Sequence, residues 1–365
     1  MENVRGGREV DGRGIKLLCR VGEWIFGQES KNLNEVATRL YFNGQNLIFL
    51  LLVSETLTIP VGFSFYEPDP KMTAWRKEEK RLKEKEVAKC YRPPTPAEDP
   101  NYPGKKALAL KLLSSFMELF PTIHVKSVAV DMFYGTKDFI DEAARITGQK
   151  QVISQIKKTQ LINVNGRNVA IGGFFKNYHG KAEQVILRGS GKTLTYRSGK
   201  FKVKSHGKKY FIIALKYEDE EEYRYLIAND MSWRDVDIIK AYSLRWLVEV
   251  FIQDWKSYEG WNQLAKQQGE EGSDHGVILS LLCDHALLLH QDQKALFENK
   301  QPAITVGSLR EKVMMESLSA FIEGIVSSDN PKAMFEEYSD KISELFELRS
   351  SIKHMRDVDM SFCNP

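Results

Sequence analysis

The segment AYSLRWLVEVFIQDWKSYEGW, residues 241–261, predicts a mostly buried helix that carries one polar stripe. Tyr242, Arg245, Glu249 and Lys256 follow one another at steps of three, four and seven residues. At about 3.6 residues per turn, these steps place the four side chains on a stripe about 60° wide. An ordinary ion pair between Arg245 and Glu249 would explain two of the four. Because the rest of the helix is apolar, we expect the stripe to face a cleft or a partner. Its donors suit phosphate, and its carboxylate suits a metal ion.

A second carboxylate ends a short apolar strand elsewhere in the chain. The segment VKSVAVD, residues 125–131, predicts a buried strand that finishes on Asp131, 118 positions before Glu249. Ligands commonly bind at this end of a strand in an α/β sheet. An aspartate that caps a helix would look the same in the sequence. We expect the Asp131 and Glu249 carboxyl groups to converge and to form the catalytic, metal-binding pair.

The chain as a whole predicts an α/β core. Strands are expected at 46–55, 57–68, 125–131 and 151–158, and helices at 71–89, 106–120 and 136–147, with a Pro-rich loop at 90–105. Residues 159–228 alternate in short segments broken by Gly and Asn, which predicts an inserted antiparallel sheet. After residue 235 the pattern is helical, with helices at 235–262, at 273–298 and beyond 307. The longest apolar run, 47–53, is too short to span a bilayer.

Positive charge is concentrated in one part of the chain. Residues 151–210 contain thirteen Lys or Arg and one acid, Glu183, a net charge of +12. The total is +3, so the remaining residues sum to −9. A basic module in an acidic body indicates a polyanionic partner, although lysines on exposed strands also prevent edge pairing. Lys157 and Lys158, which follow a predicted strand, are candidate phosphate contacts. The four cysteines are scattered and show no zinc spacing.

The pattern Tyr-x2-Arg-x3-Glu-x6-Lys resembles the signature of bacterial insertion-sequence transposases with a DDE catalytic core. The segments 43–70, 128–136, 305–313 and 353–355 resemble the same family, so the resemblance covers roughly residues 43 to 365. It implies an RNase H-like core that is interrupted by a β-strand insertion and followed by a helical C-terminal region. The implied divisions are a divergent N-terminal segment (1–42), the first part of the core (43–158), the basic insertion (159–234), core helices (235–300) and a helical tail (301–365).

The resemblance also implies a function. Asp131 and Glu249 would be the second and third acidic residues of a Mg²⁺ site, where Mn²⁺ can substitute. Tyr242, Arg245 and Lys256 would hold DNA phosphates. The partners would be the transposon ends and the target DNA, bound by a homodimer in a synaptic complex. The expected location is the bacterial cytoplasm, at the nucleoid. The N-terminus has no apolar segment typical of a secretion signal.

The first acidic residue of the family stands upstream of the segment NGQ (43–45). Asp11 is the nearest aspartate and our candidate for the third catalytic, metal-binding residue, but no apolar strand precedes it. Glu23 has a more strand-like setting, but it is a glutamate and lies close to NGQ. The third alternative is that this residue is absent. The family's N-terminal helical region is also missing, so we expect a truncated or divergent copy.

Several alternatives follow from these residues. A catalytically inactive DNA-binding remnant would keep the basic sheet and the polar stripe without a full metal site. A nuclease of the same core fold would keep the metal site without strand transfer. Asp284, His285 and His290 could be metal ligands, but core histidines on an apolar helix are commoner. Trp233 and Trp246 could stack on an extruded base, although Trp246 is expected to pack in the core.

Overall fold

The computed structural model describes residues 15–23, 46–54, 57–177, 182–186, 193–218, 220–259, 270–299 and 303–345. The chain divides into two compact units, Met1–Ala303 and Ile304–Pro365. The second unit contains the helices α10 (Val306–Val326) and α11 (Pro331–Leu345). Among the described helices, none is both long enough and apolar enough to cross a membrane.

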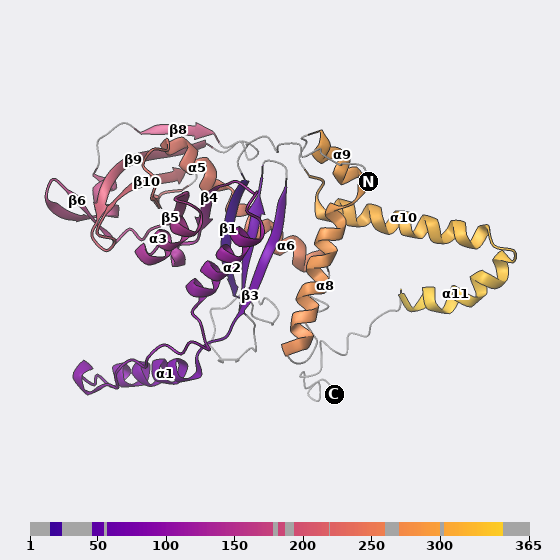
Figure 1. Cartoon of the computed structure of the whole chain (residues 1–365), viewed down its shortest axis with the longest axis horizontal. Helices are drawn as coiled ribbons and strands as arrows, with labels where there is room; N and C mark the ends of the chain where they lie inside the picture. Colours follow the sequence, from indigo (N-terminus) through magenta and orange to yellow (C-terminus); the bar gives the residue numbers. More distant parts are fainter. Residues whose placement is uncertain are drawn as a thin grey trace, which may run out of the picture. The chain divides into compact units, whose positions relative to one another are not determined.

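The first unit is built on one mixed sheet (Figure 1). Its strands are β1 (Ile15–Glu23), β2 (Asn46–Val53), β3 (Thr58–Tyr66), β4 (Val125–Val130), β5 (Gln151–Gln155), β6 (Leu161–Val164), β7 (Arg167–Ala170), β8 (Glu183–Ile186), β9 (Thr193–Val203), β10 (Lys209–Tyr217) and β11 (Arg224–Ala228). Their order is β3-β2-β1-β4-β5-β11-β10-β9-β6-β7, and β8 pairs with β9. The β1–β4 and β4–β5 pairings are parallel, and the other described pairings are antiparallel.

Helices cover both faces of this sheet. The strand β2 is continuously apolar because it is buried on both sides. Its residues Ile48 and Leu50 share a core with α2 (Lys105–Leu119) and α3 (Lys137–Ile146). The alternating residues Leu47, Phe49 and Leu51 share a second core with the helices of the opposite face. These helices are α5 (Asp235–Ser243), α6 (Trp246–Ser257) and α8 (Glu270–Leu288).

Aromatic rings fix α6 against the sheet. The Phe49 ring lies 5.6 Å from that of Phe251 and 5.0 Å from that of Trp255. Phe251 and Trp255 stand one helical turn apart and stack, with 10° between their ring planes. The indole N–H of Trp255 donates a hydrogen bond to Ser280 Oγ on α8 at 2.8 Å. The position of α6, and of any side chain on it, is therefore set by β2 and α8.

The strand β1 was not expected from its sequence, IKLLCRVGE, which mixes apolar and charged residues. It lies within residues 1–42 and pairs with both β2 and β4. The sheet therefore includes a strand that precedes residue 43. The predicted strands of 159–234 are present, but they extend the core sheet, because β11 pairs directly with β5.

Two predicted elements differ in detail. Residues 171–176 form the helix α4 (Ile171–Lys176) and do not continue the strand β7, because Ile171 and Phe175, four residues apart, are both buried on one side. The single helix predicted at 235–262 is divided into α5 and α6. At the joint, backbone hydrogen bonds from Arg245 to Tyr242 and from Val248 to Arg245 span three residues instead of four. The polar stripe is thus shared between two helices.

Candidate functional site

Asp131 follows β4 directly and precedes the short turn η2 (Met132–Tyr134). Its side chain makes no capping hydrogen bond to that turn, so the helix-cap alternative does not describe it. Its backbone carbonyl accepts a hydrogen bond from Ser154 Oγ on the neighbouring strand β5 at 2.9 Å. The residue is therefore held at the end of a central strand, with its carboxylate directed to other partners.

The carboxylates of Asp131 and Glu249 meet at one guanidinium. Arg245 Nη1 lies 2.8 Å from Asp131 Oδ1 and 3.7 Å from Glu249 Oε1. The two distances sum to 6.5 Å, which is the greatest separation that these two oxygens can have. The convergence predicted from the sequence is present. The Arg245 side chain is 17% exposed and each carboxylate side chain 30% exposed, so the cluster is open to a ligand on one side.

Tyr242 adds a buried hydroxyl to this cluster. The Arg245 guanidinium carbon lies 5.8 Å from the centre of the Tyr242 ring. Within the described residues, the Tyr242 hydroxyl finds no hydrogen-bond partner of normal geometry. Burial raises the pKa of this hydroxyl to about 12, and the Arg245 charge opposes the shift. The group is therefore a neutral hydrogen-bonding group at physiological pH.

The other aromatic and basic residues of this segment lie differently. Lys256 is half-buried, two turns beyond Glu249 on α6. Trp246 was expected to pack in the core, but that expectation is wrong, because its side chain is 64% exposed. Trp233 is half-buried against the core that contains α5 and α6. Trp246 therefore presents a large apolar surface next to Arg245.

The described residues offer two carboxylates to a metal ion, not three. No cluster of three or more His, Cys, Asp or Glu side chains that could hold a metal occurs among them. Two carboxylates fit one hydrated Mg²⁺, because this ion is often held by one or two carboxylates together with substrate phosphates. Asp284, His285 and His290 likewise form no such cluster, so their interpretation as metal ligands has no support among the described residues. His285 Nδ1 lies 2.7 Å from the Leu281 carbonyl oxygen of its own helix.

The first acidic residue is not placed beside this pair. Asp11 lies outside the described residues. Cys19 is paired with Val130 in the parallel β1–β4 register, so the next residues in step are Arg20 and Asp131. Glu23 ends β1, three residues beyond Arg20, or about 10 Å farther along the strand at 3.3 Å per residue. The backbone register therefore places Arg20, not Glu23, level with Asp131.

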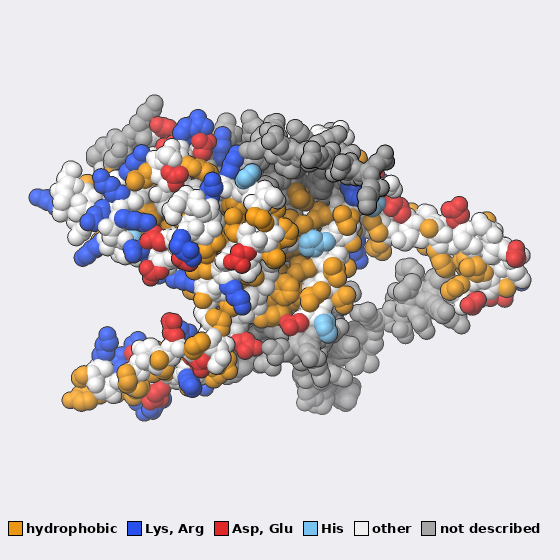
Figure 2. Space-filling view, in the orientation of Figure 1, with side chains coloured by type: hydrophobic (Ala, Val, Ile, Leu, Met, Phe, Trp, Pro, Cys, Tyr) orange, Lys and Arg blue, Asp and Glu red, His pale blue; other side chains and the backbone are white. Residues whose placement is uncertain are grey.

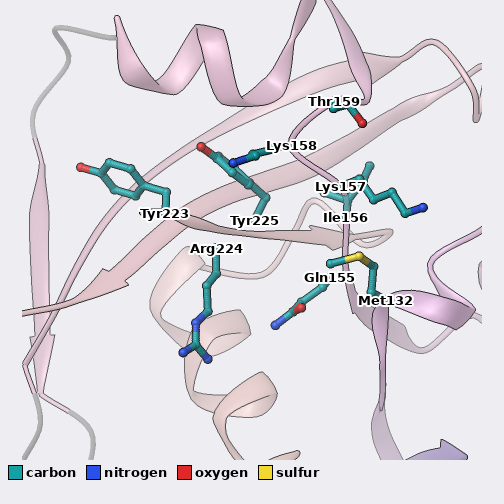
Figure 3. Close-up of a pocket in the computed structure, with 9 residues that line it drawn as sticks. All are labelled: Met132, Gln155, Ile156, Lys157, Lys158, Thr159, Tyr223, Arg224 and Tyr225. Carbon is teal, nitrogen blue, oxygen red and sulfur yellow. The ribbon is translucent and has the colours of Figure 1, made fainter. Parts of the chain in front are cut away.

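A basic hollow of about 390 Å³ begins next to Asp131 (Figure 3). Its lining includes Met132, Gln155, Ile156, Lys157, Lys158, Thr159, Tyr223, Arg224 and Tyr225. Figure 3 shows the Lys157 and Lys158 side chains extending in opposite directions. Lys158 Nζ pairs with Glu222 at 2.9 Å and Arg224 pairs with Glu220, whereas Lys157 makes no ion pair with a described residue. Of the two predicted phosphate contacts, Lys157 is thus the better available cation.

Contacts that the sequence did not reveal fix the loop after Asp131. Lys106 on α2 donates to Thr136 Oγ1 at 3.1 Å and lies 5.2 Å from the centre of the Phe133 ring. The buried His206, between β9 and β10, places Nε2 3.2 Å from the Gly135 carbonyl oxygen and Nδ1 2.9 Å from Ser205 Oγ. Burial lowers the pKa of His206, so it is neutral at physiological pH. A basic β-hairpin and a core helix thus hold the same loop.

The surface over the strands that follow β5 is rich in Lys and Arg side chains (Figure 2). Lys200, Lys202, Lys204 and Lys209 are exposed members of this group on or between β9 and β10. The predicted concentration of positive charge is therefore displayed on the surface of the folded unit. It supplies the long-range attraction that a polyanionic ligand would feel.

No family model matches the chain, and no curated protein matches it. Among solved structures, the chain is similar to a piggyBac transposase in a synaptic complex with hairpin DNA, at 9% sequence identity and a TM-score of 0.39. That match covers 92% of this chain and 58% of the transposase chain, less than two thirds of it. The chain is also similar to the NurA nuclease from Sulfolobus solfataricus, at 8% identity and a TM-score of 0.21, over 64% of this chain and 73% of that chain. At scores this low, neither similarity carries an argument about function.

Proposed function

We propose that this chain is a DNA transposase of the DDE type, which cleaves and joins the phosphodiester bonds of a mobile element with Mg²⁺. The convergence of Asp131 and Glu249 on Arg245 carries the proposal. These residues come from a strand end and from a helix that lies 118 positions later in the sequence. Two carboxylates, a guanidinium and a buried phenol in one partly open cluster suit a charged phosphate better than they suit an apolar ligand.

Each residue has a role that its position supports. Arg245, as a planar and permanently charged donor, would bind the non-bridging oxygens of the phosphate and stabilise the charge that develops there. Tyr242 would donate its hydroxyl proton to the same group. Asp131 and Glu249 would hold Mg²⁺, which activates the attacking oxygen and stabilises the leaving oxygen. Arg245 offsets part of the negative charge of the two carboxylates. With a cation held between them, its guanidinium would be available to the phosphate.

The order of the core strands supports an RNase H-like core, the fold that the resemblance implies. Three antiparallel strands, β3, β2 and β1, are followed by the parallel strands β4 and β5, with helices on both faces. DNA would be attracted by the basic strands β9 and β10 and held at Lys157, Arg245 and Lys256. The proposed assembly is a homodimer on transposon ends and target DNA in the bacterial cytoplasm, at the nucleoid.

The presence of only two carboxylates among the described residues of the cluster favours a second candidate function, a catalytically inactive DNA-binding protein derived from a transposase. A pair of metal ions needs more ligands than Asp131 and Glu249 supply. Within the described residues, no third carboxylate joins this pair. In this alternative Arg245 remains paired with the two carboxylates, and the chain binds DNA without cleaving it.

An assay of cleavage and strand joining separates the two functions. The substrate is a genomic fragment that contains the gene and the DNA on both sides of it, incubated with the full chain and Mg²⁺ or Mn²⁺. Transposase activity predicts metal-dependent cuts at two fixed positions, which Asp131→Asn and Glu249→Gln abolish while DNA binding persists. Binding without cuts in either metal would support the inactive protein. Cuts that persist in both variants would contradict the assignment of this site.

A further inference from the structure

Residues 67–104 leave the core between β3 and α2 and form an arm that contains α1 (Pro70–Glu84) and the short turn η1 (Lys89–Tyr91) (Figure 1). Asp69 starts the helix, because its carboxylate accepts hydrogen bonds from the backbone N–H of Lys71 at 2.7 Å and of Met72 at 3.3 Å. No residue of α1 is buried. The arm therefore contributes nothing to the two hydrophobic cores.

Polar contacts hold the arm together without a core of its own. The Trp75 indole N–H donates to the Pro93 carbonyl at 2.9 Å, which ties the helix to the returning segment. Arg92 donates to the Val87 carbonyl at 2.8 Å and to Glu79 Oε1 at 3.0 Å. These bonds link residues 5 to 18 positions apart and fix the helix to the segment that returns to α2. The arm is thus a braced element that can carry a contact surface.

Charge is divided between the two ends of the arm. Its outer part, residues 70–92, contains nine Lys or Arg and four acids, a net charge of +5. The two segments at its base, 67–69 and 93–104, contain four acids and no Lys or Arg. A surface helix that serves solubility alone needs charges of both signs, but it does not need this separation.

Most acidic side chains of the outer part form ion pairs with Lys or Arg side chains of the same part of the arm. Glu78 pairs with Arg81, Glu79 with Lys83 and Arg92, and Glu84 with Lys80. Four cations make no ion pair within the described residues: Arg76, Lys77, Lys85 and Lys89. Tyr91, at the turn that follows them, is 80% exposed. Uncompensated positive charge and an exposed phenol thus share the outer part of the arm.

We propose that this outer surface, formed by Arg76, Lys77, Lys85, Lys89 and Tyr91, binds the phosphates of duplex DNA away from the candidate site. The proposal rests on the DNA-binding part of the proposed function. Lys and Arg supply most phosphate contacts to DNA, and Tyr hydroxyls supply others. Lys77 lies on α1 and Lys85 is the C-cap residue of this helix. The two are eight residues apart, about 12 Å at 1.5 Å per residue. That length matches about three to four phosphates of one strand along the duplex axis.

The test measures the affinity of the full chain for DNA at a series of salt concentrations. Fluorescence anisotropy of a labelled 30-base-pair duplex of arbitrary sequence, about three helical turns long, reports the binding. The triple variant Lys77→Gln, Lys85→Gln, Lys89→Gln removes three unpaired cations and no paired one. The matched control, Arg310→Gln, Lys312→Gln, Lys332→Gln, removes the same charge from α10 and α11. Thermal unfolding verifies that both variants fold, which is expected because none of the six side chains is buried.

The arm variant should lower the slope of log affinity against log salt by about 2 to 3, since each lost phosphate contact removes about 0.9. Its affinity in dilute salt should fall at least tenfold, and the control should match the wild type. Equal losses in both variants would assign the effect to net charge and overturn the proposal. If Arg245→Met lowered the slope of log affinity against log salt and the arm variant did not, the DNA contact of the arm would be overturned and the proposed function would stand. A wild-type chain that binds no DNA would overturn the proposed function as well.

Discussion

Removal of the Arg245 side-chain charge should take away the guanidinium that lies between the Asp131 and Glu249 carboxylates. Arg245→Met keeps most of the aliphatic stem that packs beside Tyr242, so the substitution changes charge more than volume. Asp131 Oδ1 and Glu249 Oε1 lie at most 6.5 Å apart, the sum of their distances of 2.8 and 3.7 Å from Arg245 Nη1. Their mutual repulsion at that distance is about 0.6 kcal/mol in water and about 2.6 kcal/mol at an effective dielectric constant of 20.

The side chains are partly exposed, so the effect should fall between these limits. We expect Arg245→Met to lower the free energy of unfolding by about 1–2 kcal/mol in dilute buffer. This is less than the loss of about 3–5 kcal/mol that follows when one partner of a fully buried ion pair is removed. A cation that binds between the carboxylates should reverse the loss, because a ligand of the folded state stabilises it by mass action. Millimolar Mg²⁺ should therefore stabilise Arg245→Met more than it stabilises the wild type.

Urea denaturation followed by circular dichroism measures both effects, at one pH and with or without MgCl₂. A double-mutant cycle with Asp131→Asn provides the control, since Arg245→Met should cost much less where one carboxylate is already neutral. Two results would refute the reasoning. One is a loss of the same size in the Asp131→Asn background. The other is a destabilised variant that Mg²⁺ does not rescue.

Three further predictions concern the same unit. Burial and the nearby Asp284 raise the pKa of Glu259 above its ordinary value, so the folded state retains a proton that the unfolded state loses. The free energy of unfolding should therefore fall as the pH rises above the ordinary pKa of a glutamate. Glu259→Gln should make the urea midpoint less dependent on pH between pH 6 and pH 8.5, and the exposed control Glu336→Gln should leave that dependence unchanged. Trp255→Ala should cost about 3–5 kcal/mol in urea unfolding, because the side chain is fully buried against Phe49 and Phe251; a cost under about 1 kcal/mol would contradict the packing described for α6. The variant Lys202→Gln, Lys204→Gln, Lys209→Gln should lower the salt slope of DNA binding by about 2–3, and an unchanged slope would exclude the β9–β10 surface from DNA binding.

The central part of the site could be predicted from the sequence because helical spacing is local. Steps of three and four residues bring Tyr242, Arg245 and Glu249 onto one side whether or not the helix is continuous. A carboxylate at the end of a short apolar strand then identified Asp131 as a partner, and the structure places it 2.8 Å from Arg245 Nη1. The strands of residues 159–234 could also be predicted, because the sequence there alternates in short segments.

Other features depend on contacts that no local pattern reveals. The helix break at Leu244–Arg245 has no Gly or Pro to mark it, and both residues have helical backbone angles. The segment after the break is apolar on nearly all sides, so its composition could not show that Val248, Phe251 and Trp255 face the core while Trp246 faces out. The strand β1 has a weak apolar pattern and is defined by its pairing with β2 and β4. Such tertiary contacts override local preference.

The most direct test of the central claim, that Asp131 and Glu249 form one metal site, is the Mn²⁺ stoichiometry of the full chain on duplex DNA. An electron paramagnetic resonance titration counts bound Mn²⁺ in the wild type, in Asp131→Asn, in Glu249→Gln and in the double variant. A shared site predicts that each single variant loses the same one ion and that the double variant loses no more than one. Two ions lost in the double variant, or none lost in either single variant, would contradict the claim.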